Sequence, residues 1–283
     1  MLSYRHGYHA GNHADVIKHL VLLGLLEHMH QKDKPFVGID THSGNGFYRL
    51  DSAQAKKTRE AASGIIPLWR AWQAGKVENA LVRRYLERVA GFNPPDVGSV
   101  PDCYPGSPAI IHSLLRDQDR LQLMELHTSE IDLLRHNFGR DRRVSIHHRD
   151  GFEGAVAVSP PTPRRGLMLI DPAYEDKNDY QRAIKTVLAV HERWQTGIIA
   201  LWYPMLGKSR DHSRRLTEQL SRKLDSCVIE LVVAPQSDEF GLFGSGMVVV
   251  NPPWQFEANF TPVLTELNAV LGGMAGTVPG RDA

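Results

Sequence analysis

The sequence predicts an α/β fold: a seven-stranded, mostly parallel sheet with helices on both faces. Three observations support this fold. Short apolar, β-prone stretches recur along the chain and alternate with stretches of helical periodicity. Several apolar stretches end at an acidic residue or a glycine turn, and open α/β sheets bind ligands at the carboxyl ends of their parallel strands. The last two stretches, residues 228–233 and 245–250, are predicted to form a closing hairpin.

Length and composition indicate one globular domain. The chain has 283 residues, of which 42% are hydrophobic and 23% charged, as suits a large α/β domain with an insertion. The net charge is +1, so a basic surface for a nucleic acid must be local. The cysteines, Cys103 and Cys227, are far apart, which argues against a disulfide framework and fits a reducing cytosol. Because we find neither a signal peptide nor an apolar run of ~18 residues, we expect a cytoplasmic protein.

The N-terminal segment is dense in aromatic, basic and histidine residues, and a helix is predicted over residues 14–29. Its histidines could suggest zinc: His6, His9, His13 and His19. We find no cysteine or carboxylate that completes a tetrahedral set with them, so no metal site is predicted. We instead expect the segment before the helix to be a mobile or loosely packed arm that helps to close the functional site.

The first predicted strand leads into a glycine turn, Asp40-Thr-His-Ser-Gly-Asn-Gly46. Gly44 and Gly46 would let the backbone approach a ligand, and His42 lies inside the turn. The pattern also fits dinucleotide binding. Two features count against that alternative: position 49 is Arg where the third glycine would be, and the region where the acidic residue should follow is predicted to be helical.

Residues 51–103 break the alternation of strands and helices, and we interpret them as a small helical insertion after the first strand. Helices are predicted over residues 53–62, 65–72 and 77–89, with breaks near Gly64, Pro67 and Gly75. The insertion is locally basic through Lys56, Lys57, Arg59, Arg83, Arg84 and Arg88. Two interpretations stay open: a solvated helix face, or contact with a phosphate backbone.

The middle of the chain carries three further polar positions. Ser107 and Pro108 are predicted to begin a helix, with Ser107 as its N-cap, and a helix N-terminus also favours an anion. Glu125 ends a strand, where a carboxylate could accept from both hydroxyls of a ribose. Asp150 and Gly151 follow the next strand, where the carboxylate could accept from an adenine amino group.

The most informative stretch is the strand at residues 167–170 and the sequence after it, Asp171-Pro-Ala-Tyr174. A carboxylate, a prolyl carbonyl and an aromatic ring together suit a planar base with an exocyclic amine. The amine would donate to Asp171 and to the carbonyl of Pro172, and the base would stack on Tyr174. An ordinary strand end with a turn would look similar. The order of the glycine turn, Glu125, Asp150 and Asp171, each after its own strand, favours the binding site.

The last third of the chain is predicted to contain a helix over residues 178–195, a strand over 196–204 and a basic helix over 207–224. The basic helix is the best candidate for a surface that faces a nucleic acid. Its cations are Lys208, Arg210, Arg214, Arg215, Arg222 and Lys223.

These motifs resemble those of a known enzyme class. Asp171-Pro-Ala-Tyr174 resembles the Asp/Asn/Ser-Pro-Pro-aromatic motif of amino-group methyltransferases that use S-adenosylmethionine, with Ala173 in place of the second proline. Residues 40–46 resemble motif I of class I methyltransferases. The opening, residues 3–19, resembles the N-terminus of the bacterial 23S rRNA adenine-N6 methyltransferase family, and this likeness extends over nearly the whole chain.

The resemblance implies a single Rossmann-like class I methyltransferase domain, residues 1–283, with the helical insertion at residues 51–103. It implies transfer of a methyl group from S-adenosylmethionine to the N6 amine of one adenine in free or immature 23S rRNA, by a monomer that needs no protein partner. The implied catalytic residues are Asp171, Pro172 and Tyr174. The implied cofactor site consists of Lys18, His19, His42, Gly44, Ser107, Glu125, Asp150, Gly151 and Asp171. Tyr4 and His6 would contact the RNA or shape the pocket.

The sequence departs from the methyltransferase motif at position 173 and contains a second, similar motif at residues 251–254. Alanine at position 173 adds roughly 0.4–1 kcal/mol of backbone freedom relative to proline, but the contacting groups remain, so we expect an active enzyme. Asn251-Pro-Pro-Trp254 matches the catalytic motif more closely, but it follows a final strand that should be antiparallel, so we expect a structural role. Two alternatives remain: a DNA adenine-N6 methyltransferase, since the 2′-hydroxyl distinguishes the substrates, and a non-catalytic RNA-binding protein with the same fold.

Overall fold

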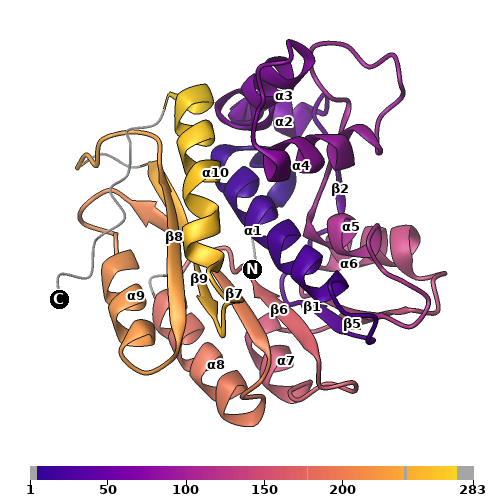
Figure 1. Cartoon of the computed structure of the whole chain (residues 1–283), viewed down its shortest axis with the longest axis vertical. Coiled ribbons are helices and arrows are strands. Elements are labelled where there is room, and N and C mark those ends of the chain that lie inside the picture. Colours follow the sequence, from indigo (N-terminus) through magenta and orange to yellow (C-terminus); the bar gives the residue numbers. More distant parts are fainter. Residues whose placement is uncertain (1–4, 177, 239–240, 273–283) are drawn as a thin grey trace.

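A seven-stranded sheet forms the centre of the molecule (Figure 1). The computed structural model describes residues 5–176, 178–238 and 241–272, so Tyr4 lies outside the described residues. The strand order is β5-β4-β1-β6-β7-β9-β8, and β9 runs in the direction opposite to that of the other six strands. The strands are β1 (Val37–Asp40), β4 (Arg120–Glu125), β5 (Val144–His148), β6 (Gly166–Ile170), β7 (Ile198–Leu206), β8 (Ser226–Val232) and β9 (Leu242–Val250). The predicted fold class and closing hairpin are confirmed.

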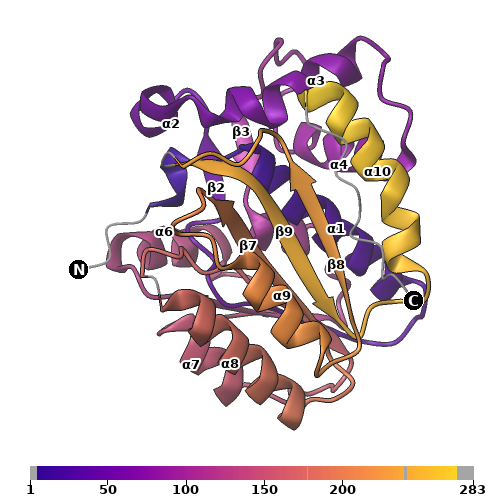
Figure 2. The same cartoon turned by 90° about the vertical axis from the view of Figure 1, so that its left-hand side faces the viewer.

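Helices cover both faces of the sheet (Figures 1 and 2). One face is covered by α1 (His13–His30), α5 (Ser107–His112), α6 (Thr128–Phe138) and α10 (Phe256–Leu271). The other is covered by α7 (Gly151–Ala157), α8 (Asp179–Arg193) and α9 (Ser213–Ser221). In β6, Leu167 and Leu169 join the first core while Met168 and Ile170 join the second. A strand buried on both faces is apolar throughout, which explains its uninterrupted hydrophobic sequence.

The helical insertion lies between two short antiparallel strands, β2 (Phe47–Arg49) and β3 (Cys103–Pro105). Its elements are α2 (Ala53–Thr58), η2 (Glu60–Ser63), α3 (Ile65–Gln73) and α4 (Ala80–Ala90). The first predicted helix is broken, because Arg59 adopts a left-handed conformation (φ +56°). Pro67 does not interrupt α3, since it lies in the first turn, where backbone N–H groups have no helical partner. Helix α4 begins late because Asn79 caps it.

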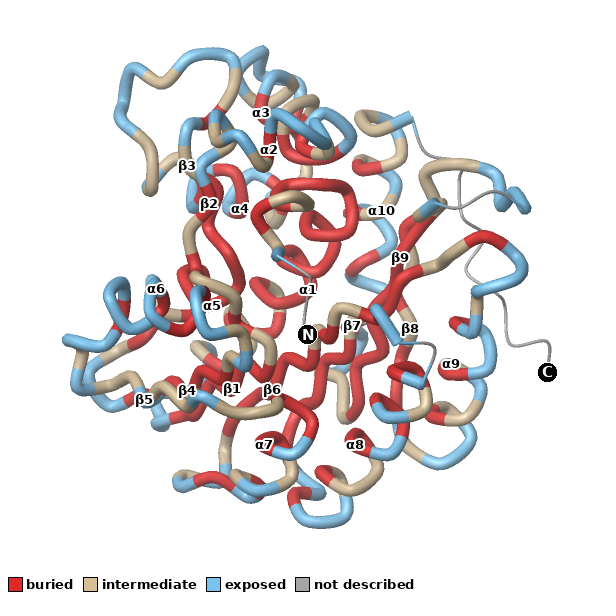
Figure 3. Tube along the Cα trace, turned by 180° about the vertical axis from the view of Figure 1, so that it is seen from behind, coloured by how far each residue is buried: buried red, intermediate tan, exposed pale blue. Residues whose placement is uncertain are grey.

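The described part of the N-terminal arm is firmly packed, so the expectation of a loosely packed segment is wrong for these residues. A short turn, η1 (His6–Tyr8), precedes α1. The carboxylate of Asp15 accepts from the backbone N–H of Gly11 and bonds the ring of His6, at 2.9 Å in each case. The side chain of Asn12 caps α1. These bonds fix the residues before α1 to the rest of the protein. Figure 3 shows that α1, which follows them, is largely buried.

The C-terminal part differs from the prediction in two places. The basic helix is shorter than expected: α9 excludes Lys208, Arg210, Arg222 and Lys223. Helix α10, which the sequence analysis did not predict, packs against β8 and α3. Its Glu266 carboxylate accepts from the backbone N–H groups of Glu78 and Asn79 at 2.7 Å, and so ties the insertion to the end of the chain.

Asn251 follows the antiparallel strand β9 and therefore lies at the edge of the sheet where β7 begins. Its side-chain amide donates to the carbonyls of Gln195 and Gly197, at 2.8 and 2.7 Å. This contact is structural and lies away from the carboxyl ends of the parallel strands. Trp254, in the same motif, is 87% exposed. Among the described helices, none combines the length and the apolar character that a membrane crossing needs.

Candidate active site

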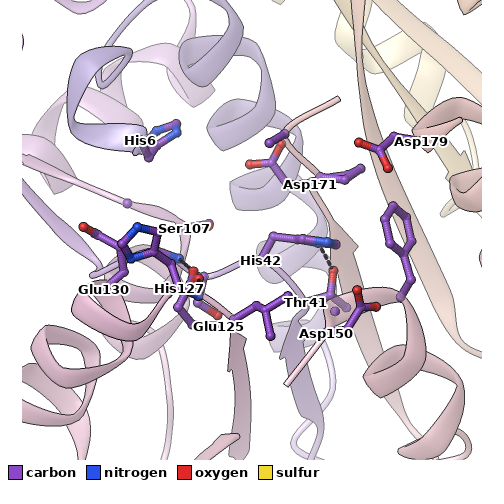
Figure 4. Close-up of a pocket in the computed structure, with 18 of the residues that line it drawn as sticks. His6, Thr41, His42, Ser107, Glu125, His127, Glu130, Asp150, Asp171 and Asp179 are labelled. Carbon is purple, nitrogen blue, oxygen red and sulfur yellow. Dashed lines mark hydrogen bonds between the residues drawn. The ribbon is translucent and has the colours of Figure 1, made fainter. Parts of the chain in front are cut away.

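Four neighbouring parallel strands end at the same edge of the sheet. From one side to the other, Asp150 follows β5, Glu125 ends β4, the glycine turn follows β1 and Asp171 follows β6. Together with residues of α1 and α5, these line one cavity of about 240 Å³. Figure 4 shows the side chains of Glu125, Asp150 and Asp171 around this space. The predicted succession of strand ends is therefore gathered into a single site.

The glycine turn is shaped for a close approach of the backbone. Gly44 and Gly46 have φ values of +58° and +87°, which favour glycine. A Cβ atom at Gly44 would collide with the hydroxyl of Tyr48. The N–H of Gly44 donates to the Glu125 carboxylate at 2.8 Å, so the turn is fixed against the end of β4.

Asp40 and Ser107 form a buried pair at the base of the turn. The Ser107 hydroxyl donates to the Asp40 carboxylate at 2.7 Å. Burial raises the pKa of Asp40 to about 6, although the bond from Ser107 opposes the shift. Ser107 is the first residue of α5 and Gly106 is the cap, so the predicted capping role of Ser107 is wrong. The physical reason is that the hydroxyl is engaged by Asp40.

Glu125 and Asp150 are both held in place by backbone groups. The Glu125 carboxylate accepts from the N–H of His127 at 2.6 Å, and burial raises its pKa. Asp150 caps α7 by accepting from the N–H of Glu153 at 3.0 Å, and it pairs with Arg182 at 2.9 Å. Burial acts to raise the pKa of Asp150, but these bonds outweigh it and lower the pKa. A carboxylate has about four acceptor positions, so both retain capacity for a ligand.

His42 and Gly151 meet across the cavity floor. A Cβ at Gly151 would collide with the carbonyl of Thr41 and lie 2.7 Å from Cε1 of His42. The Nδ1 atom of His42 lies 2.7 Å from the Thr41 hydroxyl, and its ring packs edge-on against Phe152. Burial lowers the pKa of His42 to about 4, so the imidazole is neutral at physiological pH.

Asp171 is joined to the N-terminal helix by a buried chain of charges. Nζ of Lys18 lies 2.6 Å from Asp171 and 2.8 Å from Asp15, which in turn bonds His6 at 2.9 Å. Burial acts to lower the pKa of Lys18, but the two carboxylates outweigh it and raise the pKa. Lys18 lines the cavity as predicted, and it also holds the carboxylate that was assigned to catalysis.

His19, on the same helix, is fully buried and lines the cavity. Its Nδ1 lies 2.9 Å from the hydroxyl of Tyr104. Its Nε2 has no hydrogen-bond partner among the described residues.

The structure does not bring Tyr174 into this cavity. The residue has a φ of +51°, its ring is buried, and its hydroxyl donates to the carbonyl of Trp202 at 2.8 Å. It lines a second cavity, which shares Glu175 and Asp176 with the first. The expected open face beside Asp171 is absent here, because the ring packs against Tyr180 and Trp202. The stacking role of Tyr174 stays a prediction.

Several residues of the site escaped the sequence analysis. Asp15 precedes Lys18 by three positions on one helix, a spacing that could have predicted their pair. Arg182 lines the cavity and Tyr104 bonds His19, but both are brought there by the tertiary fold, and their local sequence does not indicate it. The described residues contain no cluster of three or more potential metal ligands.

Comparison with known proteins identifies the family. A family model described as "Ribosomal RNA large subunit methyltransferase D, RlmJ" matches residues 33–279. Two curated proteins named ribosomal RNA large subunit methyltransferase J, from Escherichia coli and Haemophilus influenzae, are 45% and 43% identical over 275 residues, which cover 96% of this chain and 94% of each relative. A crystal structure of a Legionella pneumophila protein is 33% identical, covers 95% of this chain and 96% of its own, and has a TM-score of 0.84. The chain therefore belongs to the ribosomal RNA large subunit methyltransferase J (RlmJ) family.

Proposed function

We propose that this protein transfers a methyl group from S-adenosylmethionine to the N6 amine of an adenine in protein-free or immature 23S rRNA, acting as a monomer. The observation that carries the proposal is the placement of Asp171 beside the glycine turn, at the end of the strand next to β1. Membership of the RlmJ family, whose curated relatives are named for ribosomal RNA, supports the choice of substrate.

The cavity fits the cofactor. Gly44 offers a backbone surface to the methionine part, and Glu125 and Asp150 offer carboxylates to the ribose and to the adenine amine. The absence of a Cβ at Gly151 leaves a cradle that any other residue would fill. Nε2 of His19, which has no hydrogen-bond partner among the described residues, is a further polar atom on a side chain that lines the cavity. Lys18, His42 and Ser107 complete the lining. When bound, the cofactor supplies an electrophilic methyl group.

The residues of this chain would prepare the amine for attack. The target adenine must leave its stack to reach the cavity. Its N6 hydrogens would then bond to the Asp171 carboxylate and to the carbonyl of Pro172, so that the nitrogen lone pair is freed from the ring and directed at the methyl group. Asp171 can take the surplus proton. Lys18 keeps the carboxylate in one orientation through its 2.6 Å contact.

Tyr174 would hold the base by stacking. In the described conformation Tyr174 lines the second cavity and is not among the residues that line the first. Stacking therefore requires the base to approach through that second cavity, over Glu175 and Asp176, which line both.

The test is transfer of labelled methyl from S-adenosylmethionine to protein-free 23S rRNA, with the product nucleoside identified by mass spectrometry. N6-methyladenosine should form with the wild type and vanish with Asp171→Ala. Asp225→Ala, which removes an exposed carboxylate, should match the wild type. A DNA oligonucleotide of equal sequence should be a poor substrate. Cofactor binding without any transfer would contradict the proposal and favour a non-catalytic binding protein.

A further inference from the structure

A hydrogen-bonded chain of three aromatic residues links the helical insertion to the cofactor cavity. The hydroxyl of Tyr85, on α4, lies 2.8 Å from the hydroxyl of Tyr104, on β3, which lies 2.9 Å from Nδ1 of His19, on α1. All three side chains are fully buried. Nε2 at the far side of His19 has no partner among the described residues, although His19 lines the cavity. The chain thus ends at a buried ring nitrogen, unpaired among the described residues, of a side chain that lines the cavity.

His19 carries one proton at physiological pH, so the position of that proton decides what it offers to a ligand. Burial lowers the pKa of His19 to about 3, and the neighbouring Lys18 acts in the same direction. The rings of His19 and Tyr104 stack at 5.4 Å with 26° between their planes, which restrains the orientation of the imidazole. The imidazole proton lies either on Nδ1 or on Nε2.

The donors and acceptors of Tyr85, Tyr104 and His19 favour a proton on Nε2 of the imidazole. If Tyr85 donates to Tyr104 and Tyr104 donates to Nδ1, the imidazole proton lies on Nε2, and that N–H is the one donor left without an acceptor. If the chain runs the other way, the buried hydroxyl hydrogen of Tyr85 has no acceptor and Nε2 is an unsatisfied acceptor as well. Buried polar groups are rarely left unpaired, so the first arrangement is favoured. This count assigns the tautomer.

We infer that Tyr104 is a positioning residue that fixes the proton of His19 on Nε2, so that His19 donates to an acceptor on the cofactor, and that Tyr85 of the insertion orients Tyr104 for this purpose. The inference rests on the proposed use of S-adenosylmethionine. The helical insertion would thus influence cofactor affinity through this path of hydrogen bonds, without contacting the ligand itself.

The test is a set of dissociation constants for S-adenosylhomocysteine, measured by titration calorimetry. Tyr104→Phe should weaken binding roughly five- to tenfold, as expected for the loss of one buried hydrogen bond. Tyr85→Phe should weaken it less, about two- to threefold. The double variant should be no weaker than Tyr104→Phe alone, because Tyr85 acts through Tyr104. In a His19→Ala background, Tyr104→Phe should have no further effect. The KM for S-adenosylmethionine should rise while kcat at saturation stays within about twofold.

The matched control is Tyr203→Phe. Tyr203 is equally buried, but its hydroxyl donates to Glu230 and it belongs to the core on the other face of the sheet. This variant should lose stability as the others do and leave the dissociation constant unchanged. A second readout is the ¹⁵N spectrum of His19 in the ligand-free protein, assigned by its loss in His19→Ala, which should show a protonated Nε2 and a bare Nδ1.

Three results would overturn the inference: wild-type affinity in Tyr104→Phe, additive effects of Tyr85→Phe and Tyr104→Phe, or a protonated Nδ1 in the spectrum. A wild-type protein that does not bind S-adenosylhomocysteine would instead contradict the proposed function. The two failures are distinguishable, because the wild type is titrated first and the tautomer is read without any ligand.

Discussion

Lys18 and Asp171 are 153 positions apart in the sequence, yet Nζ of Lys18 lies 2.6 Å from Oδ2 of Asp171. The same ammonium lies 2.8 Å from Asp15, so one buried cation serves two carboxylates. Lys18 is 4% exposed and Asp171 12%. Because a charge in such a setting is costly unless paired, the lysine both stabilises the fold and fixes the direction of the Asp171 carboxylate.

We predict that Lys18→Met lowers kcat for methyl transfer at least about 100-fold. It should also cost roughly 3–5 kcal/mol in the free energy of unfolding, because two carboxylates lose their buried partner. Single-turnover methylation and urea denaturation measure the two effects. The control is Lys208→Met, whose exposed pair with Asp238 should contribute less than about 1 kcal/mol. An unchanged kcat in Lys18→Met would show that Asp171 needs no fixed orientation.

The sequence predicts the positions of Glu125, Asp150 and Asp171 because each depends on a local fact, the end of an apolar strand. A general rule then brings these ends together, since parallel strands present their carboxyl ends at one edge. The pair of Lys18 and Asp171 follows from no such rule. It depends on how α1 lies across the sheet, and no local pattern encodes that arrangement.

Two of the wrong predictions share a physical cause: a tertiary partner replaced a local one. The hydroxyl of Ser107 suits a helix cap, but the buried carboxylate of Asp40 engages it. The N-terminal arm is polar enough to be loose, but Asp15 holds it through His6 and Gly11. The stacking role of Tyr174 stays a prediction, although in this structure its ring packs against Tyr180 and its hydroxyl bonds the carbonyl of Trp202.

Gly151→Ala should weaken cofactor binding. The added methyl group would meet the carbonyl of Thr41 and the ring of His42, which form the floor of the cavity, so either the turn or α7 must move. We expect the dissociation constant for S-adenosylhomocysteine to rise at least about tenfold, a cost of about 1.4 kcal/mol. Gly98→Ala is the matched control, because a Cβ there meets nothing within 4 Å. Equal affinities for the two variants would exclude a close approach at Gly151.

The stability of the protein should fall as the pH drops from 6.5 towards 4. Burial lowers the pKa of His13 to about 4, below its value of 6.5 when unfolded, so the unfolded state takes up the proton first. At pH 5 this residue alone should cost about 2 kcal/mol. His19, whose pKa is also lowered by burial, destabilises the folded protein in the same way. Asp40 acts in the opposite direction, because its pKa is raised to about 6 and its protonation in the folded state adds stability over part of this range.

His13→Leu should reduce the slope of unfolding free energy against pH, measured by urea denaturation and averaged between pH 7 and pH 5, by about 0.7 of a proton. The slope is informative even if the leucine packs poorly, since a packing defect shifts stability equally at every pH. His136→Asn, at an exposed position, should keep the wild-type slope. An unchanged slope in His13→Leu would mean that His13 takes up its proton as readily in the folded state as in the unfolded state.

Tyr174 allows its stacking role to be separated from its structural role. It is a non-glycine residue with φ +51°, and strain of this kind persists at functional sites when the surroundings enforce it. Tyr174→Phe keeps the ring but loses the bond to the Trp202 carbonyl, so it should cost about 1 kcal/mol of stability and leave kcat/KM for RNA within about threefold. Tyr174→Leu removes the aromatic face and should lower kcat/KM for RNA at least about tenfold, since stacking of one base contributes roughly 1–3 kcal/mol.

Affinity for S-adenosylhomocysteine should stay unchanged in both Tyr174 variants. Tyr180→Phe, which loses a comparable bond to the Pro204 carbonyl, controls for the missing hydroxyl. If Tyr174→Leu methylates RNA as well as Tyr174→Phe does, the ring serves only the core that it forms with Tyr180 and Trp202, and the base must be held by Asp171 and Pro172 alone.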